Sequence, residues 1–133
     1  MIKSLPLASS VILVALASAA PVAAQEIPSL KGTWTGQRER IAFTEGYRDG
    51  SATLVIGEQR GMTFKGTMAW STPSGEVRED LVGGVTPGGR LMAGADAEGN
   101  YSFALVDANT LDYCYAEQGP GFRTTCARLI RKP

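Results

Sequence analysis

Thr110-Leu111-Asp112-Tyr113-Cys114-Tyr115-Ala116 and Arg123-Thr124-Thr125-Cys126-Ala127-Arg128-Leu129-Ile130-Arg131 are two alternating runs, separated by a turn rich in Gly and Pro at residues 117–122. One antiparallel register, centred near Pro120, gives the pairs Cys114 with Cys126, Asp112 with Arg128, and Leu111 with Leu129. Facing Cβ atoms in such a pair lie about 4.5–5.5 Å apart, close to the spacing that a disulfide needs. The stretch therefore predicts a hairpin closed by a Cys114–Cys126 disulfide.

Upstream of this hairpin, turn residues recur at regular intervals and leave short runs of strand length between them. Counting the hairpin, the runs are residues 32–43, 51–56, 62–70, 76–85, 90–95, 101–106, 110–116 and 123–131. Several alternate between apolar and polar residues, and none has the 3.6-residue period of a helix. We predict an all-β protein, an eight-stranded antiparallel up-and-down barrel, because closure removes exposed sheet edges. A two-sheet β-sandwich is the alternative.

The chain begins with a segment typical of export. Lys3 precedes a short apolar stretch, and Val22-Ala23-Ala24 precedes Gln25 as a small-residue cleavage pattern. Residues 1–24 are predicted to be a signal peptide, residues 25–31 a lead-in, and residues 32–133 one barrel domain. A membrane anchor is the alternative, but the apolar stretch is shorter than the roughly 20 residues of a spanning helix. We expect a periplasmic or secreted protein with no membrane span in the mature chain.

The charge balance excludes one class of partner. Lys and Arg number 13 and Asp and Glu number 13, so there is no basic field of the kind that binds nucleic acid. Export would place the two cysteines in an oxidising compartment, where an even number in a small domain usually forms a bridge.

Gly32-Thr33-Trp34 opens the first predicted strand of the eight-strand meander. This resembles the start of the lipocalin and avidin-like barrels, where a Gly-x-Trp plugs one end of the barrel. In the lipocalin relatives a basic residue from the last strand packs on that tryptophan, and the resemblance implies this role for Arg128 or Arg131. The residues that contact biotin in the avidin relatives do not match this chain, so the resemblance implies the fold and no ligand.

The sequence contains no histidine, which removes the commonest general base and the commonest metal ligand. Glu79 and Asp80 are adjacent on one predicted strand, so their side chains point to opposite faces and cannot act as a catalytic pair. Asp96 and Glu98 lie in a predicted hairpin turn and lack the ligand spacing of a calcium loop. We expect no catalytic residue, no metal and no cofactor.

The inner face of the predicted barrel is aromatic. An eight-stranded barrel is wide enough either to be filled by side chains or to hold one small ligand. If there is a pocket, tyrosines supply polar groups in it. The candidate ligand-binding residues are Trp34, Met68, Trp70, Tyr113 and Tyr115.

These features favour a non-catalytic barrel that binds a small apolar or aromatic ligand. The alternative is an envelope protein that binds or inhibits another protein through its loops, with Tyr47, Arg48 and Phe122 as exposed contacts and a filled core. The identity of the ligand or partner and the oligomeric state stay open at this point.

Overall fold

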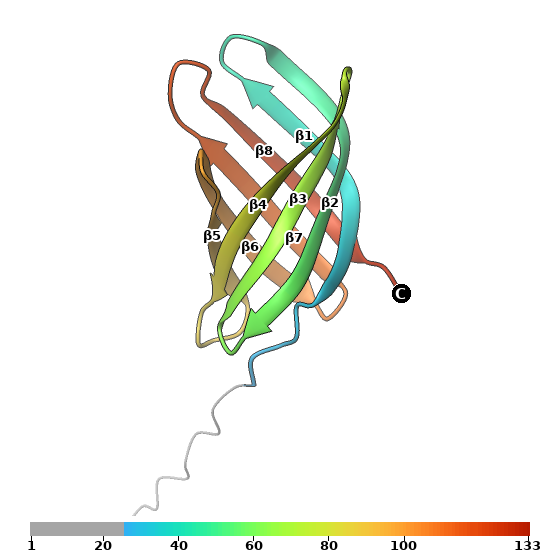
Figure 1. Cartoon of the computed structure of the whole chain (residues 1–133), viewed down its shortest axis with the longest axis vertical. Helices are drawn as coiled ribbons and strands as arrows, with labels where there is room; N and C mark the ends of the chain where they lie inside the picture. The colour runs from blue at the N-terminus through green and yellow to red at the C-terminus, as the bar shows by residue number, and fades with distance from the viewer. Residues whose placement is uncertain (1–25) are drawn as a thin grey trace, which may run out of the picture.

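A closed barrel of eight antiparallel strands forms the fold of residues 26–133, the part of the chain that the computed structural model describes (Figure 1). The strands are β1 (Gly32–Ala42), β2 (Gly46–Arg60), β3 (Thr63–Thr72), β4 (Gly75–Val85), β5 (Leu91–Ala95), β6 (Gly99–Asp107), β7 (Thr110–Glu117) and β8 (Arg123–Arg131). Each pairs with its neighbours in the chain, and β8 pairs with β1 to close the sheet. The up-and-down barrel is therefore confirmed, and the sandwich alternative is wrong.

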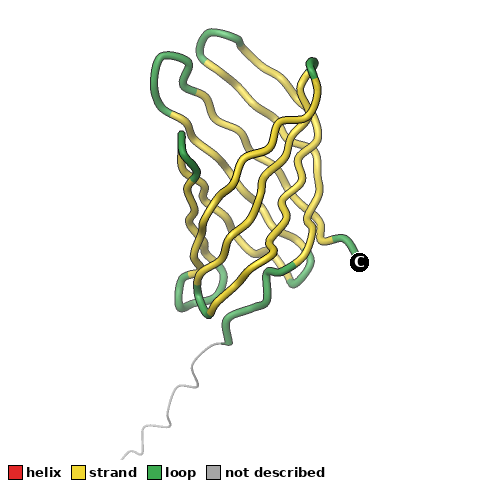
Figure 2. The backbone as a smooth tube through the Cα atoms, viewed as in Figure 1, coloured by secondary structure: helices red, strands yellow, loops and turns green. Residues whose placement is uncertain are grey.

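Strands and short connections make up the whole described region, as the tube in Figure 2 shows. No helix that could span a membrane is found between residues 26 and 133. The predicted signal peptide, residues 1–24, lies outside the described residues.

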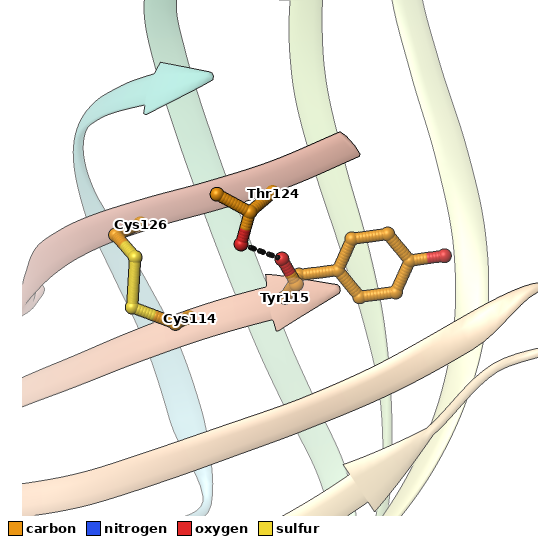
Figure 3. The surroundings of a disulfide bond; sticks show 4 residues. All are labelled: Cys114, Tyr115, Thr124 and Cys126. Atoms are coloured by element: carbon orange, nitrogen blue, oxygen red, sulfur yellow. Dashed lines mark hydrogen bonds between the residues drawn. A yellow bond between two sulfur atoms is a disulfide. The ribbon is translucent and has the colours of Figure 1, made fainter. Parts of the chain in front are cut away.

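The register of the last hairpin is the predicted one. Cys114 faces Cys126, and the disulfide between them is formed. Two rungs away, Arg128 donates two hydrogen bonds to Asp112, from Nε at 2.7 Å and from Nη2 at 2.8 Å. The bridge lies on the outer face of the barrel, and the ring of Tyr115 extends away from it (Figure 3).

The second strand is longer than predicted. The predicted run at 51–56 is the middle of β2, which pairs with β1 without a break from Gly32↔Ile56 to Ala42↔Gly46. The glycines around this run had indicated turns. Gly57 instead falls at the point where the pairing of β2 with β3 shifts by one residue, and such a bulge is a common place for glycine within a strand.

One end of the barrel, where the lead-in and the C-terminus lie in Figure 1, is sealed by apolar side chains. Trp34 is completely buried there, and its Nε1 donates to the carbonyl oxygen of Leu30 at 3.0 Å. The Arg131 guanidinium lies 4.2 Å from the centre of the indole ring, and it also donates to the carbonyl oxygens of Ser29 and Lys31. Of the two arginines that the sequence offered for this stacking, Arg131 makes the contact. We call this the closed end.

The weakest seam of the barrel lies between β4 and β5. Only residues 82–85 of β4 pair with β5, so residues 75–81 have no strand neighbour on that side. Exposed edges invite pairing with other chains, and charged side chains oppose it. Glu76, Arg78 and Asp80 project outward along this edge, while Glu79 points inward toward the other end of the barrel, the open end.

Candidate functional site

A cavity of about 100 Å³ lies inside the barrel at the open end, below the turns at residues 43–45, 73–74, 96–98 and 118–122. Its lining combines aromatic with charged side chains: Arg38, Arg40, Met68, Trp70, Glu79, Glu98, Tyr101, Tyr113, Tyr115, Glu117, Arg123 and Thr125. The barrel is thus filled in one half and hollow in the other. We call the hollow the mouth pocket.

Four of the five predicted ligand-binding side chains meet in the mouth pocket, namely Met68, Trp70, Tyr113 and Tyr115. Trp34 does not join them, because it lies at the closed end, where it is part of the core. Its inward direction follows from strand alternation, but the same alternation does not say at which end of the barrel a residue lies.

The polar half of the lining was not predicted. Arg38 and Arg40 follow Trp34 at even spacing on β1 and therefore share its inward face, which was a signal in the sequence. Both are almost completely buried, with exposed fractions of 7% and 8%. Arginines are seldom buried without a partner, because burial removes the water that hydrates the guanidinium group.

Two of the three pocket arginines have acidic partners. Arg40 donates from Nη2 to Glu45 Oε2 at 2.6 Å, and Arg123 Nε lies 3.2 Å from Glu117 Oε2. The hydrogen bond from Arg40 holds the pKa of Glu45 below its ordinary value. The first pair links the rim turn at residues 43–45 to β1, and the second joins the ends of β7 and β8 below the turn at residues 118–122.

Arg38 makes different contacts. Its Nη2 donates to the carbonyl oxygen of Ser71 at 3.0 Å, and its guanidinium lies 5.8 Å from the ring centre of Trp70. Its Nε is buried and has no hydrogen-bond partner, as is also the case for the Nε atoms of Arg40 and Arg123. Burial lowers the pKa of Arg38, with a smaller opposing effect from Tyr113, but an arginine stays protonated at neutral pH.

Asp96, in the β5–β6 turn, organises the opposite wall of the pocket. Its Oδ1 accepts hydrogen bonds from the amides of Glu98 and Gly99 and from the Tyr115 hydroxyl, and its Oδ2 accepts one from Tyr101. Burial alone would raise the pKa of Asp96, but these bonds and one from Glu79 outweigh it and hold the pKa below its usual range. The same burial raises the pKa of both tyrosines.

The Tyr115 ring fits here because residue 99 is a glycine. A Cβ at Gly99 would lie 2.7 Å from the Tyr115 hydroxyl oxygen and 2.4 Å from the carbonyl oxygen of Ala116. Tyr115 in turn packs against Tyr101, with 4.6 Å between ring centres. A continuous aromatic wall on β6 and β7 results.

Glu79 reaches Asp96 across the seam between β4 and β5. Desolvation, the hydrogen bond to Asp96, and the charges of Asp96, Glu98 and Glu117 together raise the pKa of Glu79 to about 7. With this raised pKa, Glu79 is partly protonated near neutral pH, and its protonated form is a hydrogen-bond donor to the Asp96 carboxylate. Sequence reasoning compared Glu79 only with its neighbour Asp80 and missed this partner, which lies in another element.

Glu79→Gln is expected to stabilise the protein at pH 8 by about 1–2 kcal/mol, after allowance for solvent screening, and to change little at pH 4.5. The raised pKa means that the contribution of protonated Glu79 is fully present below its ordinary pKa of 4.5 and is lost as the pH rises through about 7. Glutamine keeps a neutral hydrogen-bond donor at every pH. Urea unfolding between pH 4.5 and 8 measures the difference.

The matched control for that experiment is Glu76→Gln, which changes an outward-facing acid on the same strand. This pH range lies above 3.8, the ordinary pKa of Asp96, so the lowered pKa of Asp96 contributes little to it. If Glu79→Gln and the unmodified protein showed the same pH dependence, Glu79 would not be the group with the raised pKa.

Within residues 26–133, no group of three or more His, Cys, Asp or Glu side chains is placed to hold a metal ion.

Comparisons with known proteins identify the fold and go no further. No family model matches the sequence, and no curated protein matches it. Several solved structures resemble the barrel. One is a redesigned β-barrel with 16% identity and a TM-score of 0.53, covering 78% of this chain and 92% of the other.

The second is a protein of unknown function from Nostoc punctiforme that belongs to the DUF3598 family. It is 14% identical with a TM-score of 0.55, and the match covers 86% of this chain and 53% of that protein, so the chain spans about half of it. At such identities the likeness concerns the fold alone.

Proposed function

We propose that this protein is an exported, non-catalytic barrel that binds one small apolar or aromatic ligand in the mouth pocket. The observation that carries the proposal is the division of the interior. Apolar side chains seal the closed end, while aromatic side chains surround an unfilled cavity at the open end. Small-molecule sites are typically concave, mostly apolar, and provided with a few placed polar groups.

Export is supported by two features of different kinds. The N-terminal residues 1–24 have the pattern of a signal peptide, and the Cys114–Cys126 disulfide is compatible with an oxidising compartment. We place the protein in the periplasm or outside the cell. The contact between Arg131 and Trp34 also supports a lipocalin- or avidin-like relationship, which we keep as part of the proposal.

A binding role without catalysis is favoured by the state of the acids in the pocket. A carboxyl group with a pKa near 7 is a candidate general acid or base, and Glu79 is such a group. However, both oxygens of Asp96 already accept hydrogen bonds from the protein, and Asp96 is also the hydrogen-bond partner that helps to raise the pKa of Glu79. The sequence also contains no histidine to replace them.

Native mass spectrometry of the protein exported through a bacterial periplasm tests the proposal. We expect a mature chain that has lost two hydrogens at the disulfide and carries a reproducible non-covalent adduct. Thr125→Phe places a ring in the cavity and should remove the adduct, because Thr125 is buried in the pocket lining. Thr124→Phe, on the outward face of the same strand, should keep it. A bare protein, or an adduct that survives Thr125→Phe, would contradict ligand binding in the mouth pocket.

A second candidate function is protein binding at the rim, and exposed aromatic residues favour it. Phe43 and Phe122 stack with 4.8 Å between ring centres, although they are 76% and 48% exposed. Ile41 and Tyr47, also exposed, belong to the same region of the chain. Exposed apolar clusters of this kind often mark interaction sites. A protein-sized adduct that is lost in Phe122→Ser and kept in Thr125→Phe would support this function.

A further inference from the structure

We propose that the ligand of the mouth pocket carries a single negative charge, and that a carboxylate of the ligand pairs with Arg38. This inference rests on the proposed binding function and adds the chemical class of the ligand.

Arg38 is a buried charge that lacks a counter-charge. It is 7% exposed, and no ion pair joins it to an acid anywhere in residues 26–133. The Nε atoms of all three pocket arginines lack a hydrogen-bond partner, but Arg40 and Arg123 each have an acidic partner. Burying a charge without an opposite one is costly, and proteins normally pair such groups. The carbonyl oxygen of Ser71 and the ring of Trp70 only partly replace the lost hydration.

None of the acids that line the pocket lies within ion-pair distance of Arg38. Glu45 and Glu117 already pair with Arg40 and Arg123, respectively. Burial raises the pKa of Tyr113 to about 12, despite the opposing charge of Arg38, so this phenol is neutral at physiological pH. The counter-charge therefore has to come from a molecule that enters the pocket.

The walls limit what that molecule can be. Arg38 offers a planar fork, which suits the two oxygens of a carboxylate. Glu98 also lines the pocket and forms no ion pair within residues 26–133, so it disfavours a second negative charge. A cavity of about 100 Å³ is smaller than the engineered cavity of about 150 Å³ that accepts benzene. The cavity therefore has room for the carboxylate of the ligand and for the apolar or aromatic atoms next to it. The other end of the ligand would lie at the open end of the barrel.

The test compares carboxylates with their neutral amides on the oxidised, mature protein. Benzoate and hexanoate are titrated by calorimetry, with benzamide and hexanamide as uncharged isosteres. We expect the carboxylates to bind and the amides to bind at least tenfold more weakly. Arg38→Met should weaken carboxylate binding about 10- to 100-fold. Arg38→Lys keeps the charge but loses the planar fork, so its affinity for carboxylates should lie between that of the unmodified protein and that of Arg38→Met. Arg78→Met, on the outer face, is the matched control and should bind normally.

A second readout does not depend on the ligand. Replacing an unpaired buried charge by an apolar side chain of similar length removes a desolvation cost, so Arg38→Met should raise the thermal unfolding midpoint of the ligand-free protein. If Arg38 were a purely structural group, the same variant would lower that midpoint, and the inference would be wrong. Equal affinity for amides and carboxylates would overturn the charge assignment while leaving the proposed function intact. If neither the carboxylates nor the amides bound, both the charge assignment and the proposed binding function would be wrong.

Discussion

Trp34→Ala is expected to lower the free energy of unfolding by about 3–5 kcal/mol, the range found when a buried tryptophan is truncated in a core. Trp34 is completely buried, and both the lead-in and β8 contact it. Its indole nitrogen satisfies the carbonyl oxygen of Leu30, and the Arg131 guanidinium stacks on its ring. The variant would open the closed end and remove the contact that joins the lead-in to the last strand. Chemical unfolding followed by far-ultraviolet circular dichroism measures the loss.

The other tryptophan provides the matched control. Trp70 is only partly buried and lines the mouth pocket, so Trp70→Ala enlarges an existing hollow and should cost less, about 1–2 kcal/mol. Trp34→Phe keeps most of the volume at the closed end and should recover part of the loss. Equal effects of the two alanine variants would contradict the division of the barrel into a filled half and a hollow half.

The barrel could be predicted because the patterns that specify its strands and turns lie within short stretches of the sequence. Alternation with a period of two reports which side chains face inward, and turn residues mark where each strand ends. In the last hairpin, three favourable pairs agreed on one register, including the ion pair of Asp112 with Arg128 and the pair of cysteines. The error at β2 has the same origin, because Gly57 causes a bulge within a strand and resembles a turn residue in the sequence.

The candidate site was only half predictable, because its polar contacts join elements far apart in the chain. Arg38 on β1 reaches Ser71 at the end of β3, and Glu79 on β4 reaches Asp96 in the β5–β6 turn. Alternation can place each of these side chains inside the barrel, but it cannot say which of them meet after the sheet closes. The aromatic side chains on β6 and β7 were easier to assign, because alternation places them on the inner face of the barrel.

The misplacement of Trp34 follows from the length of a strand. Residues rise about 3.3 Å each along a strand, so Trp34 and Arg40 share the inward face of β1 and still lie about 20 Å apart. Sequence alternation gave the correct face of Trp34. The end of the barrel at which it lies depends on the tilt and stagger of all eight strands. One tryptophan therefore seals the barrel and the other lines its pocket.

Replacing both cysteines by serine is expected to cost about 2–3 kcal/mol of stability. The disulfide closes a loop with a sequence separation of 12, and the entropy of such a loop in the unfolded chain is worth roughly 3 kcal/mol. The true value should be somewhat lower, because residual structure in the unfolded chain reduces the entropy that the bridge removes. The double variant avoids the free thiol that Cys114→Ser alone would leave on Cys126.

The location of the bridge distinguishes this effect from damage to the fold. Both cysteines are exposed on the outer face, so their removal leaves the core and the mouth pocket in place. The loss should therefore arise mainly in the unfolded chain, which becomes more expanded and gives a steeper dependence of the free energy on urea concentration. Asp112→Ala, two residues away on the same outer face, removes an exposed ion pair and should cost at most about 1 kcal/mol. If the double variant were as stable as the unmodified protein, the bridge would not restrain the unfolded chain. If stability fell but the free energy of unfolding depended on urea concentration as before, the effect would lie in the folded barrel.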